Sequence, residues 1–271
     1  MNPHGLGASD IGRKRKKNED SWFVDDALGL YVISDGMGGH AAGEVASAKA
    51  VQAVREVFEA RRSEIDRARR GEMPDEHLRA MVTIAINMAC RVVYTSAKAD
   101  RALAGMGATL TVLFTAGTKV IMGHVGDSRL FLLRDNRAEQ LSNDHRMGDE
   151  LVRRGAVTPE EAERMLGGRS LTRSIGHQES VQVDTLVLDA LPGDQFVLCT
   201  DGLHDYFEQP KDLLAHIQGD FETAPERLIA FANASGGHDN ITVVTLRMDT
   251  RKMSPEATTD LSTQTQTRIL A

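Results

Sequence analysis

Four short apolar segments limit what this chain can fold into more than any other feature of its sequence. Each is rich in apolar side chains and lacks the strict alternation of polar and apolar residues that marks a strand with one face in water. Strands of this kind are covered on both faces. The four segments are residues 30–34, 110–114, 196–200 and 241–246.

The segments between these strands complete a layered arrangement. Residues 118–125 and 128–134 lie too close together in sequence for a crossover, which predicts an antiparallel hairpin. Antiparallel strands covered on both faces favour two sheets packed on each other, with helices outside. Apolar residues at helical spacing predict the helices. They are expected over residues 43–62, 75–98, 148–154, 159–165, 210–217 and 225–233.

Composition excludes several classes of protein. The 271 residues carry a net charge of -7, which argues against nucleic acid as the main partner. The N-terminus lacks the apolar stretch of a signal peptide, and no segment approaches the ~20 apolar residues of a membrane helix. The two cysteines, Cys90 and Cys199, are expected to be buried thiols in a reducing compartment. We therefore expect a cytoplasmic protein with no membrane contact.

Carboxylates flank the predicted strands at four places. Taken singly, each is a common turn former. Together they predict a cluster at one edge of the sandwich, where unpaired carboxylates would repel each other unless a divalent cation joined them. Ligands that offer only oxygen favour Mg²⁺ or Mn²⁺ over zinc. The four places are Glu19-Asp20, Asp35-Gly36, Asp201-Gly202 and Asp239-Asn240.

A basic run precedes the first of these carboxylates. The run, Arg13-Lys14-Arg15-Lys16-Lys17, could bind nucleic acid, act in localisation or be a solvated surface. A guanidinium beside a metal pair is also well suited to bind a phosphate through two hydrogen bonds. In an acidic chain we favour phosphate binding for one of these residues and simple solvation for the others.

Seven motifs, in order over roughly residues 8–248, resemble the metal-dependent protein phosphatases, also called type 2C serine/threonine phosphatases. Each motif alone is weak, and the ordered set is specific. The match is closest to short, single-domain bacterial members. The motifs are Arg15-Lys-Lys-Asn-Glu-Asp20, Asp35-Gly-Met-Gly-Gly-His40, Gly107-Ala-Thr109, Gly126-Asp-Ser-Arg129, Leu171-Thr-Arg-Ser-Ile-Gly176, Cys199-Thr-Asp-Gly202 and Asp239-Asn-Ile-Thr242.

The resemblance implies an α+β fold of four layers, α-β-β-α, with two antiparallel sheets flanked by helices. It implies a catalytic domain over residues 1–248 with a mobile flap at about 144–169. Residues 249–271 are rich in Thr, Ser and Gln and poor in apolar residues, which predicts a disordered tail. The resemblance also implies that the chain binds two Mn²⁺ or Mg²⁺ ions, with a third ion expected. In those enzymes, water activated by metal attacks phosphorus directly, without a phosphoenzyme.

Roles follow from the resemblance motif by motif. Arg15 matches the arginine that binds phosphate, and Glu19 and Asp20 would hold metal-bound waters or contact the metal. Asp35 would bridge two ions, and the Gly36 carbonyl would bind one of them. The remaining matches are Asp201 and Asp239 for the other ion, and Asp127 with Asp201 for the third.

One position departs from many animal members. There a histidine that follows the Asp-Gly pair is the proposed general acid, whereas this chain has Met37, which cannot donate a proton. A metal-bound water could serve instead. His40, His177 and His238 also lie near the motifs, so the proton donor is left open.

The resemblance predicts an active phosphatase that opposes a serine/threonine kinase. Its expected partners are that kinase and other phosphorylated proteins, and a monomer is expected. The alternative is a pseudophosphatase that binds phosphoproteins without turnover; loss of Asp35, Asp201 or Asp239 would favour it, and none is lost. A partner-switching phosphatase usually carries a sensory domain, for which this chain has no room. An unrelated metal hydrolase would require the order of the motifs to be coincidence.

Overall fold

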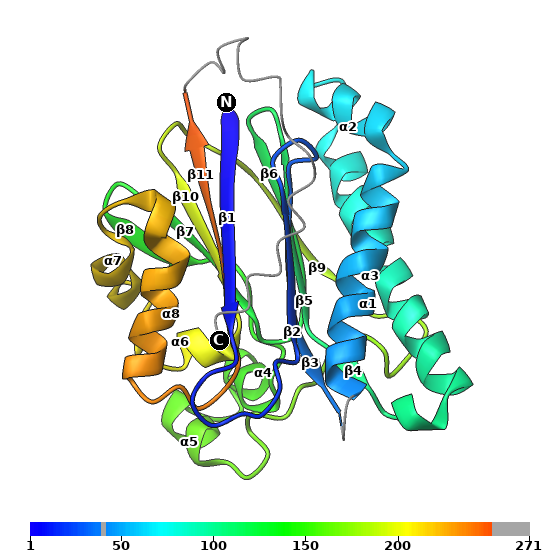
Figure 1. The fold of residues 1–271 in the computed structure, drawn as a ribbon, viewed down its shortest axis with the longest axis vertical. Helices are drawn as coiled ribbons and strands as arrows, with labels where there is room; N and C mark the ends of the chain where they lie inside the picture. The colour runs from blue at the N-terminus through cyan, green and yellow to red at the C-terminus, as the bar shows by residue number, and fades with distance from the viewer. Residues whose placement is uncertain (39–41, 251–271) are drawn as a thin grey trace.

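The computed structural model describes residues 1–38 and 42–250. Two antiparallel sheets pack face to face, and helices cover the outer face of each sheet (Figure 1). The predicted α-β-β-α sandwich is therefore confirmed. One sheet has the order β1-β11-β10-β7-β8 and the other β2-β3-β5-β6-β9, with β4 beside β3. The strands are β1 (Asn2–Asp10), β2 (Asp20–Asp25), β3 (Leu30–Met37), β4 (Gly107–Ala108), β5 (Leu110–Ala116), β6 (Lys119–Val125), β7 (Arg129–Arg134), β8 (Arg137–Gln140), β9 (Asp184–Asp189), β10 (Gln195–Cys199) and β11 (Ile241–Asp249).

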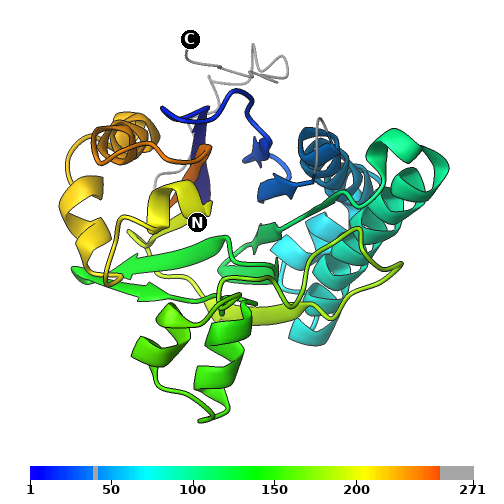
Figure 2. The ribbon, with the colours of Figure 1, turned by 90° about the horizontal axis from the view of Figure 1, so that it is seen from below.

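The helices form two outer layers and one separate group. α1, α2 and α3 cover the sheet that contains β3, and α7 and α8 cover the sheet that contains β11. α4 and α5 lie below one end of the sandwich, away from both layers (Figure 2). The helices are α1 (Ala42–Glu59), α2 (Arg62–Arg69), α3 (Asp75–Ala99), α4 (Met147–Arg153), α5 (Pro159–Arg164), α6 (Asp201–His204), α7 (Asp212–Ile217) and α8 (Ala224–Ala234).

Three apolar layers hold the four structural layers together. The central one lies between the sheets and includes Tyr31, Leu113, Phe196 and Leu246. The other two lie between each sheet and its helices. Every central strand is thus covered on both faces, which explains why these strands lack polar alternation.

The N-terminal strand β1 was not predicted. Its sequence, with Pro3, Gly5 and Gly7, has low strand propensity, yet it pairs along its whole length with β11. The glycines allow the opposite sheet to approach: a Cβ atom on Gly7 would lie 2.5 Å from the Trp22 ring. Pairing with a distant strand therefore decides the structure of this segment. Strand β9 was not predicted either, and the helix expected over 43–62 divides into α1 and α2.

Helix α3 corrects the expectation that no segment is apolar enough to cross a membrane. Within residues 1–38 and 42–250, α3 alone meets that criterion by length and composition. Its inward face, which includes Met81, Ala85 and Ala89, is buried under α1 and the adjacent sheet. Cys90 of this helix and Cys199 are free and buried, as predicted. The tail from residue 251 on lies outside the described residues.

Candidate metal centre and adjoining pocket

The pairing of β2 with β3 places two of the predicted ligands opposite each other. Asp20 is the register partner of Asp35. The Gly36 amide donates to the Glu19 carbonyl oxygen (3.1 Å), and the Asp35 amide donates to Thr109 Oγ1 (2.9 Å). The sheet ladder and these two bonds fix the backbone on which the carboxylates stand.

Two residues next to strands β10 and β11 of the other sheet form hydrogen bonds to residues at this same edge. Thr200 Oγ1, just before Asp201, donates to Asp20 Oδ2 (3.0 Å). Asn240 Oδ1, just after Asp239, accepts a hydrogen bond from the Glu19 amide (2.9 Å). Neither residue was predicted to have a role, although both lie inside the motifs. Their positions next to the aspartates were the available signal.

The carboxylates at this edge disfavour each other's charged state. Burial raises the pKa of Asp35 well above its ordinary range, and the charges of Asp20 and Asp201 raise it further. Burial also raises the pKa of Asp20 and of Asp201. Among the described residues, Asp20 Oδ1 and Asp201 Oδ1 are buried and have no hydrogen-bond partner. Buried oxygens without a donor and carboxylates that repel each other are what a bound cation would satisfy.

The donor set therefore fits the expected pair of divalent ions. All donors are oxygens, and Gly43 leaves the Gly36 carbonyl uncovered: a Cβ atom at position 43 would lie 2.8 Å from that oxygen. Within residues 1–38 and 42–250, no three His, Cys, Asp or Glu side chains already form one compact metal-binding group. Mg²⁺ usually binds through one or two carboxylates and keeps several waters, so pairs of aspartates are sufficient.

Arg15 and Glu19 lie beside these carboxylates. Arg15 Nη2 donates to Asp239 Oδ2 at 2.5 Å, and its side chain is 51% exposed. Burial raises the pKa of Glu19. In the rest of the basic run, Lys17 forms only a distant ion pair with Glu44 (3.7 Å). The structure thus places one guanidinium of the run at the carboxylate edge.

Asp127 is placed differently from the other predicted ligands. Burial raises the pKa of Asp201, and the charge of Asp127 raises it further. However, Asp127 Oδ2 accepts a hydrogen bond from Arg146 Nε at 2.6 Å. The Asp127 carboxylate is therefore already paired with a positively charged side chain.

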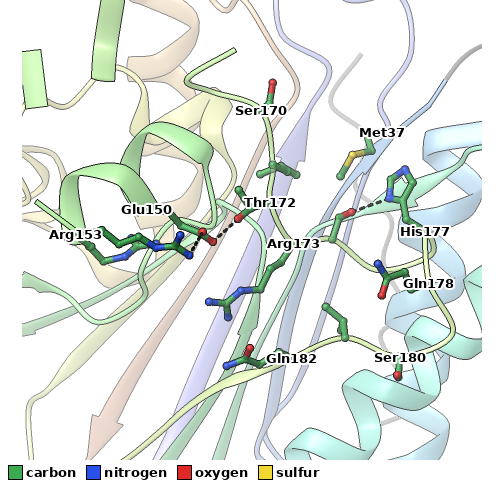
Figure 3. A pocket seen from close by; sticks show the side chains of 14 residues that line it. Met37, Glu150, Arg153, Ser170, Thr172, Arg173, His177, Gln178, Ser180 and Gln182 are labelled. Atoms are coloured by element: carbon green, nitrogen blue, oxygen red, sulfur yellow. Dashed lines mark hydrogen bonds and ion pairs between the residues drawn. The ribbon is translucent and has the colours of Figure 1, made fainter. Parts of the chain in front are cut away.

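A pocket of about 1140 Å³ has Met37, which is close in sequence to Asp35, among its lining residues (Figure 3). Met37, two residues after Asp35, forms one side, and α4 forms the opposite side with Glu150 and Arg153. Residues 170–182 complete the wall. Arg153, Arg154 and Arg173 line the pocket together with a single acidic residue, Glu150, so it is net positive although the whole chain is acidic.

The arginines of this pocket differ in how their charges are balanced. Arg173 forms an ion pair with Asp184 (2.6 Å), and Arg154 lies 3.3 Å from Glu150. Arg153 Nη1 instead donates to a backbone carbonyl, that of Asp144 (3.0 Å). An anionic group in the pocket would find Arg153 the most available cation.

Two of the histidines near the motifs can be located. His177 lines the pocket together with Met37 and bonds to Ser174 Oγ through Nδ1 (2.8 Å). His238 stacks on the Tyr206 ring, with centroids 6.3 Å apart. His40 lies outside the described residues. His177 is thus the histidine that shares the pocket with Met37.

The model of one protein family, Protein phosphatase 2C, matches residues 7–241. The chain is 35% identical over 240 residues to the serine/threonine protein phosphatase PstP of Mycobacterium tuberculosis, covering 87% of this chain and 43% of that protein. It therefore spans less than half the length of that relative. It is 31% identical over 260 residues to the serine/threonine phosphatase stp of Listeria monocytogenes, covering 94% of this chain and 99% of that protein.

A solved structure shares the fold. The catalytic domain of PstP, in complex with two manganese ions, superposes with a TM-score of 0.75 at 32% identity. The match covers 91% of this chain and 98% of that domain. That structure has the layers described above.

Proposed function

This chain belongs to the protein phosphatase 2C family, and from that premise we propose that it hydrolyses phosphoserine and phosphothreonine in other proteins. One observation carries the proposal: Asp20 and Asp35 lie opposite each other, and both interact electrostatically with Asp201 and Asp239. Buried carboxylates that repel each other beside a single exposed arginine favour a site for divalent cations and phosphate.

The metal ligands would be Asp20, Asp35, Asp201, Asp239 and the Gly36 carbonyl, with Glu19 holding water. Two Mn²⁺ or Mg²⁺ ions, when bound, would supply a water acidified at neutral pH and would offset the charge of the phosphate. The relative crystallised with manganese supports Mn²⁺ as the ion to test first.

The chain's own side chains would position and polarise the substrate. Arg15, once it leaves Asp239, can bind two phosphate oxygens through its planar guanidinium. Water attacks phosphorus directly: a new P–O bond forms, the bond to the serine or threonine oxygen breaks, and that oxygen takes up a proton. Met37 cannot supply this proton. His177, in the same pocket, is a candidate donor beside solvent water.

The positive pocket would receive the substrate chain next to the phosphorylated residue. Its wall is formed by α4 and by residues that follow the proposed flap, about 144–169. Arg153 would contact an acidic side chain of the substrate. The flap would then affect which protein is dephosphorylated and not the chemistry itself.

The cellular setting follows from the same premise. Phosphatases of this specificity act against a serine/threonine kinase, and we infer that such a kinase and its substrates are the partners. Two buried, unpaired thiols support a reducing, cytoplasmic location. The acidic net charge supports protein partners over nucleic acid. We propose a monomeric catalytic domain over residues 1–248.

The test is hydrolysis of p-nitrophenyl phosphate and of a phosphothreonine peptide, with Mn²⁺, with Mg²⁺ and with a chelator. We expect turnover that depends on metal and is lost in Asp35→Asn and Asp239→Asn. Asp189→Asn, at an exposed position of β9, is the matched control and should keep full activity. No turnover by folded, metal-loaded protein on either substrate would contradict the proposal and favour a protein that binds phosphoproteins without hydrolysing them.

A further inference from the structure

Arg146 forms a buried ion pair with Asp127. Nε of Arg146 lies 2.6 Å from Asp127 Oδ2, and the side chains are only 8% and 11% exposed. Arg15, the other arginine that contacts a predicted ligand, is 51% exposed. A buried guanidinium cannot be exchanged for water and ions as a surface one can.

The backbone on both sides of Arg146 is fixed. The preceding residue, His145, donates its amide to the Gly126 carbonyl (2.8 Å), next to Asp127. Arg146 itself forms a β-bridge with Leu171, and its carbonyl accepts from the Glu150 amide (3.0 Å) at the start of α4. The side chain therefore reaches Asp127 from a rigid support.

The three carboxylates that lie within 4 Å of Arg146 each have an arginine as a close partner. Three arginines and three aspartates form close pairs: Arg146 with Asp127 (2.6 Å), Arg129 with Asp144 (2.8 Å) and Arg169 with Asp205 (2.6 Å). Arg146 also lies 3.9 Å from both Asp144 and Asp205. Each carboxylate of these three pairs already has a guanidinium partner, and Arg146 would repel an added divalent cation at Asp127.

We propose that the guanidinium of Arg146 takes the place of a third cation between Asp127 and Asp201, so that this protein binds two divalent ions and not three. The residues at Asp127 thus do not fit the third ion that the family resemblance implies. The proposal rests on the two-ion site proposed above and concerns only the adjacent position.

Arg146 also links this position to the flap. It precedes the first residue of α4, the helix that carries Glu150 and Arg153 of the pocket wall. An ion in this place could leave when the metal concentration falls. The guanidinium cannot, so the connection between Asp127 and α4 is independent of metal.

The experiment counts bound Mn²⁺ by native mass spectrometry and by electron paramagnetic resonance during a Mn²⁺ titration. The wild-type chain should bind two ions, and Arg146→Ser should bind three because Asp127 is then free to hold an ion together with Asp201. Adding Asp127→Asn to Arg146→Ser should return the count to two. Arg146→Lys, which keeps the charge, should stay at two.

Three ions in the wild-type chain, with one lost in Asp127→Asn, would overturn the inference, as would two ions in folded Arg146→Ser. If Arg146→Ser does not fold, the wild type and Asp127→Asn decide: equal counts of two support the inference, and a lower count in Asp127→Asn overturns it. A wild-type count of zero would overturn the two-ion site as well, which separates the two failures.

Discussion

Arg15 Nη2 lies 2.5 Å from Asp239 Oδ2, so the side chain proposed to bind phosphate pairs with a side chain proposed to bind metal. The ion pair with Asp239 holds the Arg15 guanidinium close to the proposed metal ligands. The arginine is half-exposed and can turn to a phosphate when an ion takes over Asp239. Metal binding would therefore release Arg15 for the substrate.

Arg15→Ala should change metal binding and catalysis in opposite directions. Removing a positive charge beside Asp239 should tighten Mn²⁺ binding severalfold, because like charges repel. Loss of the phosphate contacts should lower kcat/KM by about 10²-fold. Calorimetric titration with Mn²⁺ and steady-state kinetics measure the two effects. Arg13→Ala, in the same basic run, is the control; weaker Mn²⁺ binding in Arg15→Ala would refute the explanation.

Gly43→Ala should destabilise the protein and weaken metal binding together. The new methyl group would lie 2.8 Å from the Gly36 carbonyl oxygen and 2.9 Å from Cδ of Glu19. Alanine normally stabilises a helix relative to glycine by about 0.5–1 kcal/mol. Here we expect a loss of about 1–3 kcal/mol in the free energy of unfolding. Urea denaturation with and without Mn²⁺ measures both effects, with Glu44→Ala as the neighbouring control. A stabilised Gly43→Ala would show that a methyl group at position 43 does not press on the Gly36 carbonyl.

Arg153→Ala should affect peptide substrates only. Its guanidinium lines the positive pocket and is bonded to a backbone carbonyl, not to a carboxylate. We expect KM to rise severalfold for a phosphothreonine peptide with acidic neighbours, and kinetics with p-nitrophenyl phosphate to stay unchanged. Arg164→Ala, on α5 outside the pocket, is the matched control. An equal effect on both substrates would place Arg153 in the chemistry instead of in peptide recognition.

His124 should make folding stability fall in mild acid. Burial lowers the pKa of His124 to about 4, from an ordinary value of 6.5. In the neutral ring, Nε2 donates to the Gly126 carbonyl (3.0 Å) and Nδ1 can accept from Thr111 Oγ1 (2.9 Å). Between pH 6.5 and 4, His124 is protonated in the unfolded chain but stays neutral in the folded chain. The contribution of His124 to the free energy of unfolding is therefore fully present above pH 6.5. It falls as the pH drops toward 4, by up to roughly 3 kcal/mol in total.

The check is urea denaturation from pH 7.5 to 5 for the wild type and for His124→Gln. Glutamine can keep one of the two hydrogen bonds and does not titrate in this range. The variant should be less stable at pH 7.5 but should show a smaller loss toward pH 5. The same slope in both proteins would mean that another group controls this range. His77→Gln, on the exposed start of α3, is the control.

Sequence reasoning reached the parts of this structure that depend on local chemistry. Pro159 and the acidic residues after it predicted α5, and the structure shows a full capping box between Thr158 and Glu161. The aspartates at strand ends predicted one edge, because buried strands leave few places for charge. The sandwich followed from the absence of alternation in the central strands.

Features that depend on distant partners were out of reach. β1 is a strand because β11 lies beside it, more than 230 residues later in the chain. The ion pair of Arg146 with Asp127 forms because His145 is bonded to Gly126, and nothing in the spacing of 19 residues indicates it. The roles of Thr200 and Asn240 likewise depend on how the two sheets meet.

The pairing of β1 with β11 has a consequence for the newly made chain. On the ribosome, the first strand must wait without its partner until residues 241–249 have emerged. At about 5–20 residues per second, this delay lasts roughly 10–50 s. The carboxylates of the site also come from both ends of the sequence, Asp20 early and Asp239 late. A nascent phosphatase would thus stay inactive until residue 249 has emerged, and its unpaired edge would be a target for chaperones during that interval.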